Sequence, residues 1–96
     1  MNRKIKMERG SGNIFADIGF PPDEAQNLML RAELMLRIRK AAEGFTQAEA
    51  ARRFGVTQPR INDLLRGKID KFSLDALVIM LGKAGLRVEL QVRKAA

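Results

Sequence analysis

The run from Gln47 to Gly67 limits the fold of this chain more than any other stretch. Two helices that cross at a steep angle through a tight turn need a small residue where they touch, a glycine able to adopt positive φ in the turn, and apolar residues on the inner face of the second helix. The run has such residues at the required spacing. They are Ala51 at the crossing, Gly55 in the turn, and Val56, Ile61 and Leu64 facing inward. The spacing predicts two short helices joined at the glycine.

Capping residues mark where both short helices begin, and together the two helices make a helix-turn-helix. Thr46 is followed three residues later by Glu49, a pair in which each side chain can bond the backbone N–H of the other. Thr57 can cap the second helix, where Pro59 is tolerated in the first turn. We expect the first of the two helices to end at Gly55.

Further helices are expected on both sides of this unit. Asn13 can cap a single turn that ends at Gly19. A long helix is expected over residues 23–43, with acidic residues in its first turn and basic residues in its last. Ser73 can cap a final helix that ends before Gly85. The sequence therefore predicts a mainly α domain of four to five helices.

The long helix has wider apolar coverage than one core contact needs, which is a stripe of about 100°. Its apolar residues form two stripes, and an apolar cluster, which we call the anchor, precedes the helix. The stripes are Leu28, Ala32, Met35 and Leu36, and Leu30, Leu34, Ile38 and Ala41; the anchor is Ile14, Phe15 and Ile18. Either one stripe faces the core and the anchor covers the other, or the second stripe binds a partner.

The hydrophobic period changes to two near the C-terminus, which indicates an amphipathic β-strand. The alternating apolar residues are Leu86, Val88, Leu90 and Val92. A lone strand leaves its backbone groups unpaired, so this one must pair either with residues 14–20 or with a second copy of the chain. We expect the second copy, and hence a homodimer. The expected organisation is a flexible basic tail and apolar anchor over residues 1–22, a helix-turn-helix domain over residues 23–85, and a dimerisation strand over residues 86–96.

Composition narrows the range of functions. The chain has 96 residues and contains neither cysteine nor histidine, which removes disulfides and the common ligands of transition metals. Without these residues, and without paired carboxylates at a recognisable spacing, we expect neither an enzyme nor a cofactor. No apolar stretch is long enough to span a membrane, so a cytoplasmic location is expected. The net charge of +7 favours nucleic acid as the partner, ahead of an acidic protein or an anionic membrane.

The run from Gln47 to Gly67 also resembles the helix-turn-helix of the lambda repressor and Cro superfamily, often called the xenobiotic response element family. The resemblance covers roughly Leu34 to Leu81 and is fairly specific for the fold. It implies that the helix from Gln58 to Arg66 enters the major groove of double-stranded DNA, with its N-terminal side chains against base edges. For a homodimer, it implies an operator that is an inverted repeat with half-sites about one helical turn apart.

Carried over residue by residue, the resemblance implies that Gln58 and Arg60 read bases, because a glutamine amide pairs with adenine and an arginine fork with guanine. The other residues expected at the DNA are Gln47, Thr57 and Asn62 near phosphate or sugar, Pro59 on the same face, and Arg66, Lys68 and Lys71 on the backbone. Pro59 and Asp63 depart from the polar residues that many relatives have on this face. Asp63 would repel phosphate, and could instead accept from a cytosine amino group or pair with a neighbouring arginine.

A second resemblance covers most of the chain. The segment NIFADIGFPPDEAQNLMLRAELMLRIRKA, the F-S-L run at Phe72 to Leu74 and the ending LGKAGLRVEL are similar to short antitoxin-type regulators of the same family. This resemblance implies a repressor that neutralises a small toxin ribonuclease and represses its own toxin-antitoxin operon. Two alternatives stay open: a stand-alone or phage-type regulator without a toxin, and a helical module that binds protein and never DNA.

Overall fold

The computed structural model describes residues 13–94, and these residues form five α-helices and one 3₁₀ turn without any β-strand. The elements in chain order are α1 (Ile14–Asp17), α2 (Pro22–Ala41), α3 (Gln47–Phe54), α4 (Gln58–Leu65), η1 (Ile69–Lys71) and α5 (Leu74–Lys83). The expectation of a mainly α fold is confirmed. The expected flexible tail of residues 1–12 lies outside the described residues.

Each short helix begins at the residue that the sequence predicts as its cap. The hydroxyl of Thr46 accepts from the backbone N–H of Glu49 at 3.1 Å, and the Glu49 carboxylate accepts from the N–H of Thr46 at 2.9 Å. The hydroxyl of Thr57 accepts from the N–H of Arg60 at 3.3 Å. The hydroxyl of Ser73 accepts from the N–H of Ala76 in the same way. These bonds satisfy N–H groups that a helix start otherwise leaves open.

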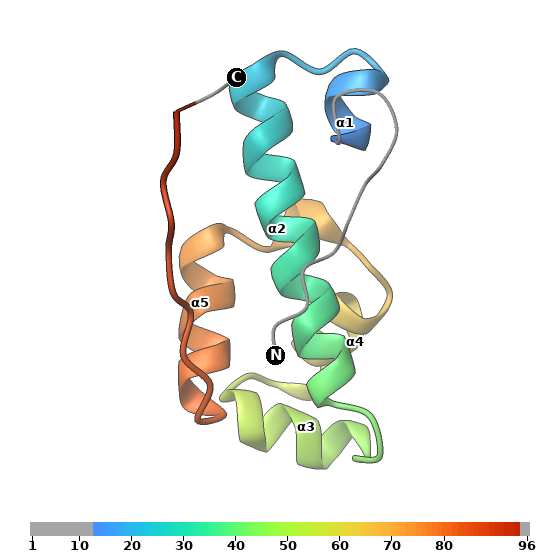
Figure 1. Ribbon diagram of the computed structural model, residues 1–96. Helices are drawn as coiled ribbons and strands as arrows, with labels where there is room; N and C mark the ends of the chain where they lie inside the picture. The colour runs from blue at the N-terminus through green and yellow to red at the C-terminus, as the bar shows by residue number, and fades with distance from the viewer. Residues whose placement is uncertain (1–12, 95–96) are drawn as a thin grey trace.

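The helices pack around the long helix α2, which runs the length of the molecule (Figure 1). Its C-terminal part contacts α4 and α5, α3 closes the end of the molecule, and α1 lies beside the N-terminal part of α2. The largest fully buried side chains come from α2, α3, α4 and α5, and from the residue that follows η1. They are Ile38, Phe54, Ile61, Leu64, Phe72 and Leu77. Burial of side chains of this size stabilises the fold by about 1.5–3 kcal/mol each.

The buried face of α2 is a single face that takes residues from both predicted stripes. Leu28 and Met35 come from the first stripe and Ile38 from the second, whereas Leu30 and Leu36 are 40% and 48% exposed. The division into two separate stripes was therefore wrong, because the core lies between them. The segment that contains the predicted anchor does lie beside this helix, and the Asn13 side chain donates to the Ala25 carbonyl at 3.1 Å. Ile14 and Ile18 nevertheless remain 52% and 67% exposed, so only Phe15 of the anchor is partly covered.

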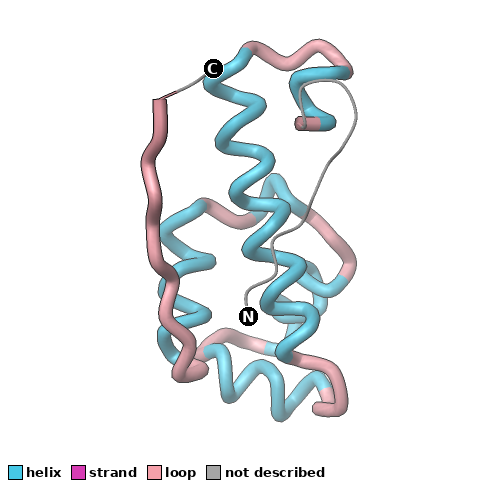
Figure 2. The backbone as a smooth tube through the Cα atoms, in the orientation of Figure 1, coloured by secondary structure: helices cyan, strands magenta, loops and turns pink. Residues whose placement is uncertain are grey.

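Residues 86–94, which we call the C-terminal segment, run back beside α5 without regular secondary structure (Figures 1 and 2). The N–H of Leu86 donates to the Leu81 carbonyl at 2.9 Å and fixes where the segment starts. The predicted strand is not formed within the described chain. The alternative of pairing with residues 14–20 is wrong, because Ile14–Asp17 is helical. Pairing with a second copy stays a prediction.

Candidate nucleic-acid interface

The turn between α3 and α4 has the geometry that a helix-turn-helix needs. Gly55 adopts φ +72°, in the left-handed region that suits glycine. The N–H of Val56 donates to the Ala51 carbonyl at 2.9 Å and closes the end of α3. A Cβ atom on Gly55 would lie 2.7 Å from Cδ of Lys83, so the Lys83 side chain would have to shift to admit it. The positive φ confirms the predicted role of this glycine.

Helix α4 has a buried face and an exposed face. Ile61 and Leu64 are buried in the core, as predicted, while Thr57, Gln58 and Pro59 are exposed on its first turn. Because its inner residues fix the helix against α2 and α3, the first turn faces away from the molecule. This arrangement leaves the Gln58 side chain open to solvent.

Two side chains expected near phosphate lie next to each other. Nδ2 of Asn62, on α4, donates to Oε1 of Gln47 at 3.5 Å, and Gln47 is the first residue of α3. The N-terminus of α3 thus lies beside the exposed face of α4. A helix N-terminus has free backbone N–H groups and a positive dipole end, both of which attract phosphate.

Arg60 makes contacts within the chain that the sequence did not indicate. Its guanidinium carbon lies 4.1 Å from the centroid of the Phe72 ring, which is a cation–π contact. Its Nη1 donates to the Lys71 carbonyl at 2.7 Å. The Arg60 side chain therefore connects α4 to residues 68–72, which we call the basic loop and which include η1.

The basic loop holds its two lysines close to α4. Nζ of Lys68 and Nζ of Lys71 lie 3.3 and 3.8 Å from the two carboxylate oxygens of Asp63. The sequence suggested that Asp63 could pair with an arginine; its partners are these two lysines instead. Arg66 is exposed just past the end of α4. The region from Thr46 to Phe72 contains six basic and three acidic residues, a net charge of +3.

Arg31 is a residue of this region that sequence reasoning missed. Its Nη1 donates to the carbonyls of Ile69 and Phe72 at 3.0 and 3.4 Å, and its Nε donates to Oδ1 of Asn27 at 2.7 Å. Arg31 therefore fastens the basic loop to α2. Nothing in the local sequence signals this role, because a basic residue on the polar side of a helix is ordinarily solvated.

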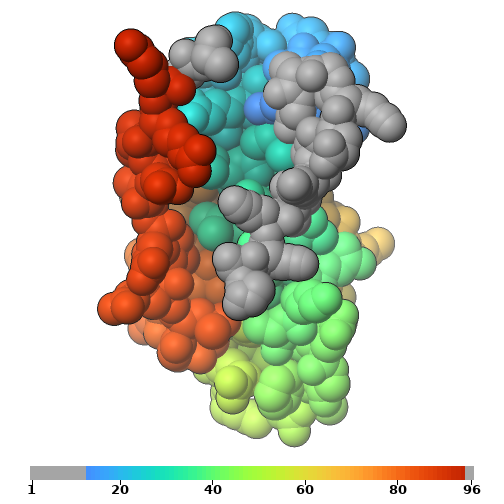
Figure 3. All heavy atoms as spheres, in the orientation of Figure 1, coloured from blue at the N-terminus to red at the C-terminus, as the bar shows by residue number. Residues whose placement is uncertain are grey.

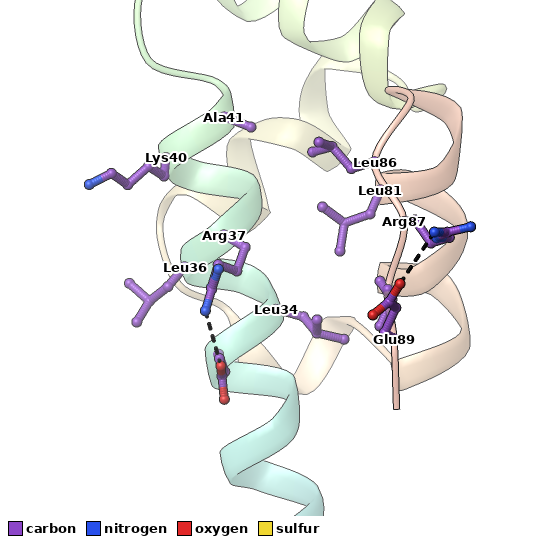
Figure 4. A pocket seen from close by; sticks show the side chains of 11 residues that line it. Leu34, Leu36, Arg37, Lys40, Ala41, Leu81, Leu86, Arg87 and Glu89 are labelled. Atoms are coloured by element: carbon purple, nitrogen blue, oxygen red, sulfur yellow. Dashed lines mark hydrogen bonds and ion pairs between the residues drawn. The ribbon is translucent and has the colours of Figure 1, made fainter. Parts of the chain in front are cut away.

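A groove of about 880 Å³ lies between α2 and the C-terminal segment, away from the exposed face of α4. Leu34, Leu81 and Leu86 point into it, whereas Leu36 and Lys40 point away from the C-terminal segment (Figure 4). The space-filling view shows the C-terminal segment along one edge of the molecule (Figure 3). Leu90 and Val92, further along the segment, are 82% and 84% exposed.

Residues 13–94 contain neither a candidate metal site nor a candidate membrane span. No group of three or more potential acidic or histidine ligands gathers to hold a metal ion. No helix in this part of the chain is long and apolar enough to cross a membrane.

The tight glycine turn, the two capped short helices and the exposed start of the second helix define a helix-turn-helix domain, a class of domain that binds DNA. A family model described as "Helix-turn-helix domain" matches residues 14–93. The chain belongs to this helix-turn-helix domain family. None of the curated proteins compared with the chain matches it.

Proposed function

We propose that the protein is a sequence-specific transcriptional repressor that inserts α4 into the major groove of its operator. The observation that carries the proposal is the exposed first turn of α4, with Gln58 at its surface and Ile61 and Leu64 holding it in place. A glutamine amide at this position pairs with adenine N6 and N7. The adjacent N-terminus of α3, with Gln47, is suited to a backbone phosphate.

The remaining predicted contacts surround this reading surface. We assign Thr57, Pro59 and Asn62 to the face that meets phosphate and sugar, and Arg66, Lys68 and Lys71 to the neighbouring backbone. Contacts of this kind set the register of a protein on DNA, while base-edge contacts choose the sequence.

Selection of binding sites from random double-stranded DNA tests the proposal. We expect a single enriched motif in the form of an inverted repeat, with half-sites about 34 Å apart from centre to centre. The Gln58→Ala variant should bind the enriched site more weakly and lose preference at one base pair per half-site. If no motif is enriched, and if the protein binds no DNA of any sequence at low salt, the result would instead favour a protein-binding module.

The inverted repeat follows from the homodimer that we propose. Its support is the C-terminal segment, whose alternating apolar residues are only partly covered by their own chain: Leu86 lines the groove beside α2, but Leu90 and Val92 are almost fully exposed. Antiparallel pairing with the same segment of a second copy would satisfy its backbone and cover these side chains.

The antitoxin role is a further part of the proposal, supported by the resemblance of the segments before and after the helix-turn-helix to antitoxin-type regulators. The partner would be a small toxin ribonuclease encoded beside this protein. Co-expression with the neighbouring gene product, followed by purification of the untagged partner and footprinting of the shared upstream DNA, tests both roles together. Footprinting without a co-purified partner would identify a stand-alone or phage-type regulator.

A further inference from the structure

We infer that Arg60 is a positioning residue, which holds the basic loop in place so that Lys68 and Lys71 meet the DNA backbone, and that base reading at this part of α4 is left to Gln58. The inference rests on the proposed function, because it concerns how the same surface meets DNA. It assigns Arg60 a role different from the base contact that the family resemblance implies.

The flat face and the N–H donors of the Arg60 guanidinium both make contacts inside the chain. Its face lies 4.1 Å from the centroid of the Phe72 ring, and Phe72 is 1% exposed and part of the core. Its edge donates to the Lys71 carbonyl at 2.7 Å. An arginine reads guanine with two donors of one planar fork. Reaching a base edge would therefore require Arg60 to give up its contacts with the ring and the carbonyl.

The loop that Arg60 contacts depends on side chains from outside it. Its regular structure is the single 3₁₀ turn Ile69–Lys71, and such short turns have little stability of their own. Arg31 donates to the Ile69 and Phe72 carbonyls from α2, and Arg60 donates to the Lys71 carbonyl from α4. The guanidinium groups of Arg31 and Arg60 therefore attach the loop to two different helices, and together they bind three of its five carbonyls.

The position of the loop decides where its two positive charges lie. The ammonium groups of Lys68 and Lys71 converge on the carboxylate of Asp63, at 3.3 and 3.8 Å. A DNA phosphate that approaches this side of α4 would compete with the carboxylate for the two ammonium groups. Without the bond from Arg60 to the Lys71 carbonyl, the loop would keep its attachment to α2 through Arg31 and the buried Phe72 but lose its attachment to α4, so the two lysines would be held less firmly beside α4.

The Arg60→Lys variant separates the two roles, because lysine keeps the positive charge but has neither a planar fork nor a guanidinium face. For a positioning residue, we expect Arg60→Lys and Arg60→Ala to weaken operator binding alike, by about tenfold, and by the same factor for every single-base variant of the operator. The salt dependence should also become shallower for Arg60→Lys, by about 0.9 for each phosphate that Lys68 or Lys71 no longer neutralises. Gln58→Ala serves as the comparison that relaxes preference at one base pair.

A result in which Arg60→Ala relaxes preference at one base pair, and Arg60→Lys restores it in part, would overturn the inference, since lysine can also bind guanine. Failure of the wild-type protein to select any DNA sequence would instead count against the proposed function. The two failures are thus distinguishable.

Amide hydrogen exchange of the free protein tests, without DNA, whether Arg60 holds the basic loop in place. We expect the amides of residues 68–72 to exchange faster in Arg60→Lys and Arg60→Ala than in the wild type. Arg53→Ala is the matched control, because it removes a similar contact, between a guanidinium and the Phe45 ring at 4.8 Å, from α3. Wild-type exchange rates in the basic loop of both Arg60 variants would overturn the inference.

Discussion

At the scale of single residues, Gly55 combines two constraints that mutation can separate. The Gly55→Ala change should destabilise the fold by about 1–2 kcal/mol, because alanine disfavours the left-handed region and its Cβ would displace the Lys83 side chain. Gly67→Ala is the matched control, with a similar φ of +75° and no atom within 4 Å of the added Cβ. Urea unfolding measures both, and Gly55→Ala should cost more. Equal losses would mean that Lys83 moves aside without cost.

Asp63 is the second residue whose role follows from its contacts. Replacement by asparagine would remove the carboxylate that lies between Lys68 and Lys71. We expect Asp63→Asn to bind DNA of unrelated sequence several-fold more tightly, because the variant lacks a negative charge that repels phosphate and both ammonium groups are freed. Stability should change by about 1 kcal/mol at most, because the two lysines are exposed and the carboxylate is only partly buried. Fluorescence anisotropy with a scrambled duplex measures the affinity, and an unchanged value would contradict the expectation.

The contacts of Arg31, Arg60 and Asp63 could not be predicted from the sequence. Arg31 bonds carbonyls 38 and 41 positions away, and Arg60 bonds a carbonyl 11 positions away. Such bonds depend on how helices pack, and no local spacing encodes them. The cap at Thr46 was predictable because both of its bonds are made within four consecutive residues.

At the scale of secondary structure, the start of α3 gives a simple test of the helix-turn-helix. Thr46→Ala removes the acceptor for the Glu49 N–H and should lower the free energy of unfolding by about 1 kcal/mol. Thr46→Ser retains the hydroxyl and should recover most of that stability. Thermal unfolding followed by circular dichroism measures the series. A serine variant as unstable as the alanine variant would show that the methyl group, not the cap, is what matters.

The C-terminal segment is the element whose role depends on a second chain. The Leu90→Pro change removes a backbone donor at a residue that is 82% exposed, so the helices should remain folded. If the segment pairs across the dimer, this variant should sediment as a monomer and bind the operator far more weakly. Leu90→Thr, which keeps the backbone N–H and a strand-forming side chain, is the control. A proline variant that remains dimeric would place the subunit contact elsewhere, with the exposed face of α2 as the next surface to test.

Helices whose ends are set by nearby residues in the sequence were predictable. Features that depend on packing against another element or another chain were not. The helices were expected from caps, glycines and apolar spacing, and α2 differs from its predicted range by one residue at its start and two at its end. The sequence did not indicate which face of α2 is buried, because apolar residues occur on nearly all of its sides and only the positions of α4 and α5 decide the matter. The alternation in the C-terminal segment indicated a strand, but a single chain contains no described strand for it to join.

At the scale of the whole molecule, the net charge of +7 makes ionic strength the main control of DNA affinity. If a dimer neutralises on the order of 6 to 10 phosphates, operator affinity should fall by roughly 10³ to 10⁵ between 50 and 200 mM salt. Titrations at several salt concentrations measure the slope. A flat dependence would favour the protein-binding alternative, since backbone contacts to DNA always release counterions.

The exposed end of the C-terminal segment has a consequence for how a repressor of this kind would respond to its own abundance. Leu90 and Val92 are almost fully exposed in the single chain, and in the homodimer that we propose a second subunit would cover them. When association of two subunits precedes binding, mass action makes the concentration of the competent species rise with the square of the monomer concentration under dilute conditions. Operator occupancy would then show a threshold: negligible during early synthesis of the protein, and steep once subunits are abundant enough to meet.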